Sequence, residues 1–350
     1  MNNKIIMVST FRHLFLGLSL ACSDKVSRYH VLFIDQKTEE ENNRFYQIAK
    51  EVLKPFATVS AIPVRLKVQS KKKYRNVVFR LLDAMLETLK PVELITGNDR
   101  RLEFQYAMYF LTNKLSLKTQ GGYLDDGTGS YRNMHDFKHL SRLSDQLIDT
   151  PLKRLAYGRW YHRPKTLGAS KWIDCSYLTF PDIALSPLKS KKILKIEGPQ
   201  YTKGFLASII KEYANYFCIE SCSGVSKSVL IALPHSSIIK ELYGSKYNLM
   251  SKVEEMLRLY PSAFVKYHPR EVGDPLGLKE RATFLSASVP AEFYLATINF
   301  DLVIGDVSTV LMSAKWLQPG CDVQYLPNNS GHTKALKSIF QDLNINEFVL

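Results

Sequence analysis

Residues 4–10 read Lys4-Ile5-Ile6-Met7-Val8-Ser9-Thr10, an apolar run followed by two hydroxyl side chains. Residues 11–21 then carry apolar side chains on nearly every side of a helix. A short apolar run is typical of a strand buried on both faces, and Ser and Thr are favoured at helix N-caps. The stretch therefore predicts a buried strand, a tight turn and a helix, the repeating unit of a parallel α/β sheet.

The same alternation extends through the first half of the chain. Apolar runs of strand length alternate with segments in which apolar residues recur at helical spacing. The pattern predicts a mostly parallel, doubly wound sheet. Further strands are expected at residues 29–34, 92–96 and 122–124, and helices at residues 39–53, 77–89 and 101–113.

A second series of strands and helices begins at Val229-Leu230-Ile231-Ala232-Leu233, which again has the pattern of a buried strand. Helices are expected at residues 238–242 and 247–258, and strands at residues 263–266 and 301–304. Two such units that face one another across a cleft form the GT-B arrangement, and open α/β sheets bind ligands at the carboxyl ends of their strands. We therefore expect an α/β protein of the GT-B class, with two Rossmann-like, doubly wound domains.

Shifts in composition suggest where these domains begin and end. The first domain is expected at residues 1–200, with a basic and aromatic insertion near residues 150–195. It ends close to a helix expected at residues 201–220. The second domain is expected at residues 225–325, and residues 326–350 form a C-terminal tail able to pack back on the first domain.

The charge of the chain favours anionic partners. Its 47 basic and 33 acidic residues give a formal net charge of +14 over 350 residues. Basic runs lie at residues 71–75, 154–165 and 189–195. They are either solvated faces or contacts with an anionic inner membrane, to which basic side chains are attracted. Nucleic acid is not expected as a partner, since no motif interleaves basic and aromatic residues in the way that RNA- and DNA-binding modules do.

The five cysteines lack the spacing of a metal site, so they read as free thiols in a reducing compartment and no metal held by cysteine is expected. The apolar stretch at residues 14–22 is shorter than the roughly 20 residues that span a bilayer. We expect a cytoplasmic protein, either free or peripheral on the inner membrane.

An acidic pair follows the strand expected at residues 122–124. Asp125-Asp126-Gly127 has the composition of a tight turn, which needs no function. Adjacent carboxylates can also present a general base to an acceptor hydroxyl, or they can ligate a metal ion. The pair alone leaves these three interpretations open.

Two further polar motifs follow strands of the second half. Lys266 precedes His268-Pro269 at the end of an expected strand, where a histidine can stabilise the charge of a departing nucleotide. Ser308-Thr309 lies between a strand and a helix. It is either an ordinary helix cap or a phosphate contact that combines backbone N–H groups with two hydroxyls.

In this order and spacing the motifs resemble those of the bacterial sialyltransferases, a superfamily that includes lipooligosaccharide sialyltransferases and capsule polysialyltransferases. Its members share an acidic pair followed by glycine, a His-Pro after a strand of the C-terminal domain, and a later Ser/Thr pair. A glutamate between the last two motifs contacts the nucleotide in the family, and Glu292 stands at that place here. The Ser9-Thr10 turn adds a weaker likeness.

One position departs from the family. In the lipooligosaccharide branch the base is an aspartate after a proline at the first strand of the second domain, whereas this chain has Pro234-His235. In the other branches the base is the first acid of the acidic pair. The resemblance therefore assigns the base to Asp125, with Asp126 and His235 as alternatives. His235 can equally be a residue that neighbours a helix cap.

The resemblance implies an inverting, metal-independent glycosyltransferase without a cofactor. It would move sialic acid or a related nonulosonic acid from a CMP-activated donor to a glycan of lipooligosaccharide, O-antigen or capsule. Asp125 would deprotonate the acceptor and His268 would stabilise the leaving CMP, which requires that the two face one crevice. The other residues expected to contact the nucleotide-sugar are Thr10, Gly127, Lys266, Pro269, Glu292, Ser308 and Thr309.

Other functions fit the same residues. CMP-linked donors share their leaving group, so CMP-Kdo remains an alternative donor, and a UDP-sugar is another. A non-catalytic, membrane-associated polysaccharide assembly protein would carry the same basic runs. The first domain is expected to hold the acceptor and the second the CMP-sugar.

Overall fold

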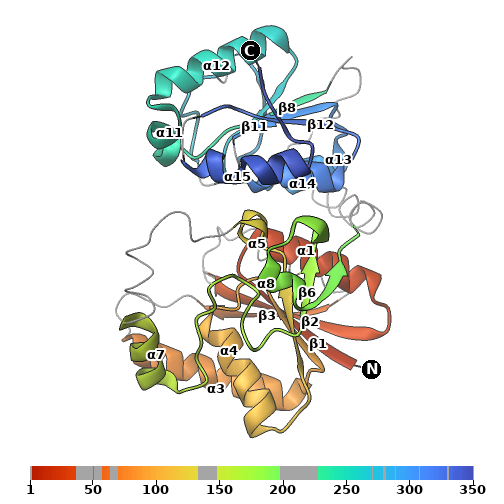
Figure 1. Ribbon diagram of the computed structural model, residues 1–350, viewed down its shortest axis with the longest axis vertical. Coiled ribbons are helices and arrows are strands. Elements are labelled where there is room, and N and C mark those ends of the chain that lie inside the picture. The colour runs from red at the N-terminus through yellow and green to blue at the C-terminus, as the bar shows by residue number, and fades with distance from the viewer. Residues whose placement is uncertain are drawn as a thin grey trace. The chain divides into compact units, whose positions relative to one another are not determined.

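The computed structural model describes residues 2–36, 50, 57–63, 70–132, 148–197, 228–269, 271–278, 281–287, 289–306, 308–328 and 331–349. The chain divides into two compact units, Met1–Ile196 and Glu197–Leu350 (Figure 1). Each unit is built on one parallel sheet that helices accompany. The expected pair of α/β domains is therefore present.

The first unit contains a seven-stranded sheet of order β3-β2-β1-β4-β5-β6-β7. Neighbouring strands pair in parallel throughout this order. The order reverses between β1 and β4, and doubly wound sheets bind ligands at such a reversal. The strands are β1 (Asn2–Val8), β2 (Ser27–Gln36), β3 (Ala57–Pro63), β4 (Glu93–Thr96), β5 (Gln120–Leu124), β6 (Cys175–Leu178) and β7 (Lys192–Lys195).

The apolar run that opens the chain lies in the centre of this sheet. Residues 5–8 of β1 are at most 1% exposed, and burial on both faces accounts for their continuous apolar pattern. The Thr10 side chain accepts a hydrogen bond from the His13 backbone N–H and so caps the first helix. The helices are α1 (Phe11–Ser23), α3 (Lys71–Leu89), α4 (Leu102–Tyr109), the π-helical turn η1 (Phe110–Lys114), α5 (Thr128–Tyr131), α7 (Thr150–Tyr157), the short 3-10 turn η4 (Pro181–Ile183) and α8 (Ser186–Lys189).

The second unit contains a six-stranded sheet of order β10-β9-β8-β11-β12-β13, again with parallel neighbours. This order reverses between β8 and β11. The strands are β8 (Val229–Ala232), β9 (Phe264–Lys266), β10 (Thr283–Leu285), β11 (Leu302–Gly305), β12 (Asp322–Tyr325) and β13 (Asn346–Glu347). The helices are α11 (Ser236–Tyr243), α12 (Lys246–Leu259), α13 (Ala291–Thr297), α14 (Thr309–Leu317) and α15 (Gly331–Asp342).

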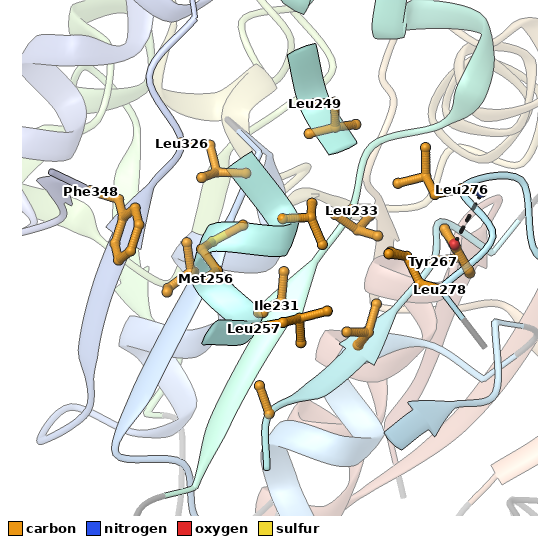
Figure 2. Packing of buried hydrophobic residues seen from close by; sticks show 14 of the residues in the cluster. Ile231, Leu233, Leu249, Met256, Leu257, Tyr267, Leu276, Leu278, Leu326 and Phe348 are labelled. Atoms are coloured by element: carbon orange, nitrogen blue, oxygen red, sulfur yellow. Dashed lines mark hydrogen bonds between the residues drawn. The ribbon is translucent and has the colours of Figure 1, made fainter. Parts of the chain in front are cut away.

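A hydrophobic core joins the sheet of the second unit to α12. Figure 2 shows Met256 and Leu257 of α12 beside Ile231 of β8. Leu326 and Phe348 belong to the same cluster, although both lie in the segment that the sequence set apart as a tail. Residues 326–350 thus supply α15, the edge strand β13 and core side chains to the second unit.

The segment expected as an insertion near residues 150–195 supplies β6 and β7, the last two strands of the first sheet. Of the helix expected at residues 39–53 only Lys50 is described, and the helix expected at residues 201–220 lies outside the described residues. Cys22, Cys175 and Cys321 are free thiols. Among the helices of the described ranges, none is both long and apolar enough to cross a membrane.

Candidate functional site

The first sheet gathers polar loops at the edge where its strands end. Ser9 and Thr10 follow β1, Gly97 follows β4, and the acidic pair follows β5. Carboxyl ends of parallel strands share one edge of the sheet, so these residues come together next to the reversal between β1 and β4. The first-half residues predicted from the sequence therefore lie where a ligand is expected.

Asp125 is fully buried. Its Oδ2 accepts hydrogen bonds from the Thr179 backbone N–H at 3.0 Å, the Arg12 guanidinium at 3.2 Å and the hydroxyls of Thr179 and Tyr131. Its Oδ1 accepts the Gly127 backbone N–H at 2.7 Å. Burial raises the pKa of Asp125, but the Arg12 charge and these donors outweigh that effect and lower the pKa below its ordinary value. Asp125 thus ties the first turn of α1 to the loops after β5 and β6.

Asp126 differs from its neighbour because 29% of its side chain is exposed. Its Oδ1 lies 2.7 Å from Nε2 of His13, and Nδ1 of His13 lies 3.2 Å from Oγ of Ser9. The His13 ring is only 1% exposed. With its proton on Nε2, a neutral imidazole donates to Asp126 and accepts from the Ser9 hydroxyl, so both ring nitrogens are satisfied. Two hydrogen bonds therefore link Ser9, the buried His13 ring and the partly exposed Asp126 carboxylate.

Two glycines make this arrangement possible. A Cβ on Gly97 would lie 2.0–2.3 Å from three atoms of the His13 ring, so only a residue without a side chain fits beside the imidazole. Gly127 has a φ of 69°, in the left-handed region that favours glycine. The turn at Gly127 returns its N–H to Asp125, whereas Asp126 contacts His13.

Four further residues of this edge were not predicted from the sequence: Arg12, His13, Tyr131 and Thr179. One signal was available for the first two. They are adjacent polar residues at the start of a helix that is otherwise apolar on nearly every side, and both are buried in the structure. Buried polar groups require partners. The acidic pair downstream supplies those partners.

The second sheet brings two predicted histidines together. His235 follows β8 as the N-cap of α11, and its Nδ1 accepts the Ser237 backbone N–H at 3.2 Å. His268 follows β9, and the two rings are 5.3 Å apart at 83°, an edge-to-face contact. The Nε2 of His235 also lies 3.5 Å from a carboxylate oxygen of Glu271. Pro269, next in the chain, is exposed.

Lys266 is buried instead of reaching into solvent. Its ammonium donates to the backbone carbonyls of Tyr267 at 3.1 Å and Ala287 at 3.2 Å. Burial lowers the pKa of Lys266 to about 8, although the nearby Glu292 charge raises it. The side chain therefore joins the end of β9 to the loop that follows β10.

The remaining predicted residues lie on neighbouring helices of the second unit. Glu292 is in the first turn of α13 and accepts a hydrogen bond from the Ser313 hydroxyl of α14 at 3.1 Å. Ser308 is the N-cap of α14 and Thr309 its first residue, and both are half-buried. Within the described residues, no three His, Cys, Asp or Glu side chains are grouped so as to hold a metal ion.

The sequence model of the alpha-2,8-polysialyltransferase family matches residues 23–326. The chain belongs to this family. It is therefore a glycosyltransferase, and it takes a nucleotide-linked sugar as donor and a glycan as acceptor. The match begins after most of α1, so Ser9 and His13 lie outside it. No curated protein matches the chain.

Solved structures confirm the fold class. UDP-GlcNAc 2-epimerase from Methanocaldococcus jannaschii is 13% identical, with a TM-score of 0.56 and coverage of 100% of this chain and 89% of that chain. The Neisseria meningitidis enzyme bound to UDP-GlcNAc is 12% identical, with a TM-score of 0.55 and coverage of 100% and 87%. UGT89C1 of Arabidopsis thaliana is 10% identical, with a TM-score of 0.52 and coverage of 99% and 84%. At such low identity these likenesses show the fold alone, which is GT-B.

Proposed function

We propose that this polysialyltransferase-family protein moves sialic acid or a related nonulosonic acid from a CMP-activated donor to a cell-surface glycan. The displacement inverts the anomeric carbon and needs neither a metal ion nor a cofactor. The observation that carries the proposal is the partly exposed Asp126 carboxylate, held by buried His13 at the carboxyl edge of the first sheet. Family membership supports the class of sugar.

Asp126, in place of Asp125, is the general base of this proposal. Both oxygens of Asp125 accept hydrogen bonds from inside the protein. A Cβ on Gly129 would lie 3.2 Å from Oδ2 of Asp126, closer than an ordinary contact, so the glycine keeps a side chain from crowding that oxygen. As the acceptor hydroxyl attacks the anomeric carbon, Asp126 takes its proton and the bond from that carbon to the phosphate oxygen breaks. A positioned base contributes roughly 10²–10⁴ in rate.

His13 acts on the reaction through Asp126. Its Nε2–H holds Oδ1 and leaves Oδ2 to receive the proton. The ring is itself fixed by Ser9 on one side and by the backbone at Gly97 on the other. His13 is therefore a positioning residue, and it keeps the base in one orientation as an acceptor arrives.

His13→Ala is expected to lower kcat by roughly 10–100-fold while the KM for the donor stays within about twofold, because the base keeps its charge and loses its orientation. His13→Gln places an amide donor near the position of Nε2 and is expected to recover part of the lost kcat. Steady-state kinetics on both variants checks this. Equal kcat for His13→Ala and the wild type would remove the positioning role.

The second unit supplies the groups for the leaving nucleotide. His268, with His235 against its ring, donates to the phosphate, and the first N–H groups of α14 at Ser308 and Thr309 add to the anion contact. Glu292 contacts the ribose or the base. Lys266 contributes indirectly, since its ammonium is occupied by the carbonyls of Tyr267 and Ala287.

CMP is expected to raise the melting temperature of the protein, whereas UDP and ADP at equal concentration are not. A ligand at a hundred times its Kd stabilises the folded state by about 2.7 kcal/mol. His268→Ala should lose most of this stabilisation, and Asp126→Asn should keep it because the carboxylate lies on the acceptor side of the reaction. Differential scanning fluorimetry measures all three. A shift with UDP alone would point to a UDP-sugar donor.

A donor panel then separates the remaining candidates. Mass spectrometry of products from CMP-sialic acid, other CMP-nonulosonates, CMP-Kdo and UDP-GlcNAc, each with EDTA present, identifies the sugar transferred. Transfer from CMP-Kdo and from no other donor would mean that the protein transfers Kdo and not a nonulosonic acid. Stabilisation by CMP without transfer from any donor would instead indicate a non-catalytic assembly protein.

A further inference from the structure

Helix α7 (Thr150–Tyr157) holds its apolar side chains away from the core. Within the described part of the chain, the helix buries none of its residues. Leu152 is 58% exposed and Leu155 is 87% exposed, and Ile148, in the turn that leads into the helix, is 59% exposed. Residues at spacings of four and three lie on the same face of a helix. These three residues therefore form one apolar stripe, here called the α7 stripe.

The α7 stripe belongs to an anchored helix. The Tyr157 ring meets the Phe79 ring of α3 edge-on, with centroids 6.2 Å apart, and Figure 1 shows α7 beside α3 at the outer side of the first unit. Arg154 donates through Nε to the Tyr161 carbonyl at 2.9 Å. Tyr161 is itself buried in a small aromatic cluster with Trp160. The fold thus fixes the helix in place and leaves its apolar face turned outward.

The surroundings of the α7 stripe are basic. Residues 148–172 contain six basic residues and one acidic residue, Asp149. Lys153 and Arg163 both approach Asp149, at 2.7 Å and 3.3 Å, so this single carboxylate is neutralised from two sides. The other four basic residues of this stretch are all exposed and are here called the basic rim: Arg154, Arg159, Lys165 and Lys171.

We propose that the α7 stripe and its basic rim dock the protein on an anionic lipid bilayer. Ile148, Leu152 and Leu155 enter the boundary between head groups and acyl chains, and the rim contacts the negative head groups. An apolar helix face edged by Lys and Arg is the usual form of such contacts. Each basic residue near an anionic surface strengthens binding by roughly fivefold. Charge complementarity therefore favours a bilayer over a neutral partner, and the inference stands apart from the catalytic roles assigned above.

The test is cosedimentation of the full chain with large unilamellar vesicles, either pure phosphatidylcholine or with about a third phosphatidylglycerol. The wild type is expected to bind the anionic vesicles and to leave the neutral ones in the supernatant. The double variant Leu152→Ser with Leu155→Ser is expected to bind at least tenfold more weakly. Its matched control, Val77→Ser with Leu81→Ser, changes two side chains of α3 that are 55% and 51% exposed, and it should bind like the wild type.

A second pair of variants tests the charge of the rim. Arg159→Gln with Lys165→Gln and Lys171→Gln should weaken binding strongly. Lys71→Gln with Lys72→Gln and Lys73→Gln, which removes the same charge from α3, should weaken it far less. Equal loss in both triple variants would show attraction by net charge alone and would overturn the assignment. Equal binding to neutral vesicles would overturn it too. A stripe variant that keeps its vesicle binding but changes oligomeric state in light scattering would also overturn the assignment. The α7 stripe would then be a contact between two copies of the chain.

Discussion

Asp126→Asn is expected to lower kcat for sugar transfer by roughly 10²–10⁴-fold, the contribution of a positioned general base. The amide keeps the shape of the side chain, and its oxygen still accepts the hydrogen bond from Nε2 of His13. It cannot take the proton of the acceptor hydroxyl at neutral pH. Initial rates with a CMP-activated donor, at saturating donor and acceptor, measure the loss.

The variant should otherwise behave as the wild type. Because the Asp126 side chain is partly exposed, its melting temperature is expected to change little. Full activity of Asp126→Asn would end the assignment of the base to this residue.

Asp125→Asn is expected to act on the fold, with a loss of about 3–5 kcal/mol in the free energy of unfolding, the cost of breaking a buried ion pair from one side. The Arg12 guanidinium would lose the charge that compensates it. The new amide would also place a donor or a weaker acceptor among the N–H and O–H groups of Thr179, Tyr131 and Gly127. Denaturant unfolding followed by fluorescence measures the difference.

The loss of stability in Asp125→Asn should depend on pH. The pKa of Asp125 is lower in the folded protein than the value of about 3.9 in an unfolded chain. Its stabilisation is therefore complete above pH 3.9 and is lost as the pH falls through the folded pKa. The gap in stability between the wild type and Asp125→Asn should be constant near neutrality and narrow at strongly acid pH.

The two variants also discriminate between the neighbouring acids. If Asp125→Asn folds with unchanged stability and loses transfer, whereas Asp126→Asn transfers normally, the assignment made from sequence resemblance would hold and the structural one would fail. We expect the opposite outcome: Asp125→Asn lowers the free energy of unfolding, and Asp126→Asn lowers kcat.

The sequence predicted the central strands well because they are buried on both faces. β1, β8 and β11 each contain a continuous apolar run, and the structure places them in the middle of their sheets. The edge strand β7 escaped notice for the converse reason. β7 begins and ends with lysine and lies at the sheet edge, where both lysines are exposed and the two residues between them are half-buried. Its pattern resembles a basic surface loop.

The location of the candidate site could also be predicted, but the different environments of its two acids could not. Strand ends pointed to the acidic pair and to His268, and the structure places each at the expected edge. Which of the two acids is buried depends on the backbone turn at Gly127. The positive φ of that glycine cannot be deduced from the sequence. His13 lies 113 residues from its partner, and no local pattern links the two.

One buried carboxylate joins the start of α1 to the loops after β5 and β6. Because all three segments hold the same anion, they are expected to shift together or not at all. The orientation of the Asp126 side chain is then fixed when the first unit folds. In the proposed mechanism, an acceptor hydroxyl would then meet a carboxylate that is already oriented, and the conformational entropy of orienting it would be lost once, during folding, and not at each turnover.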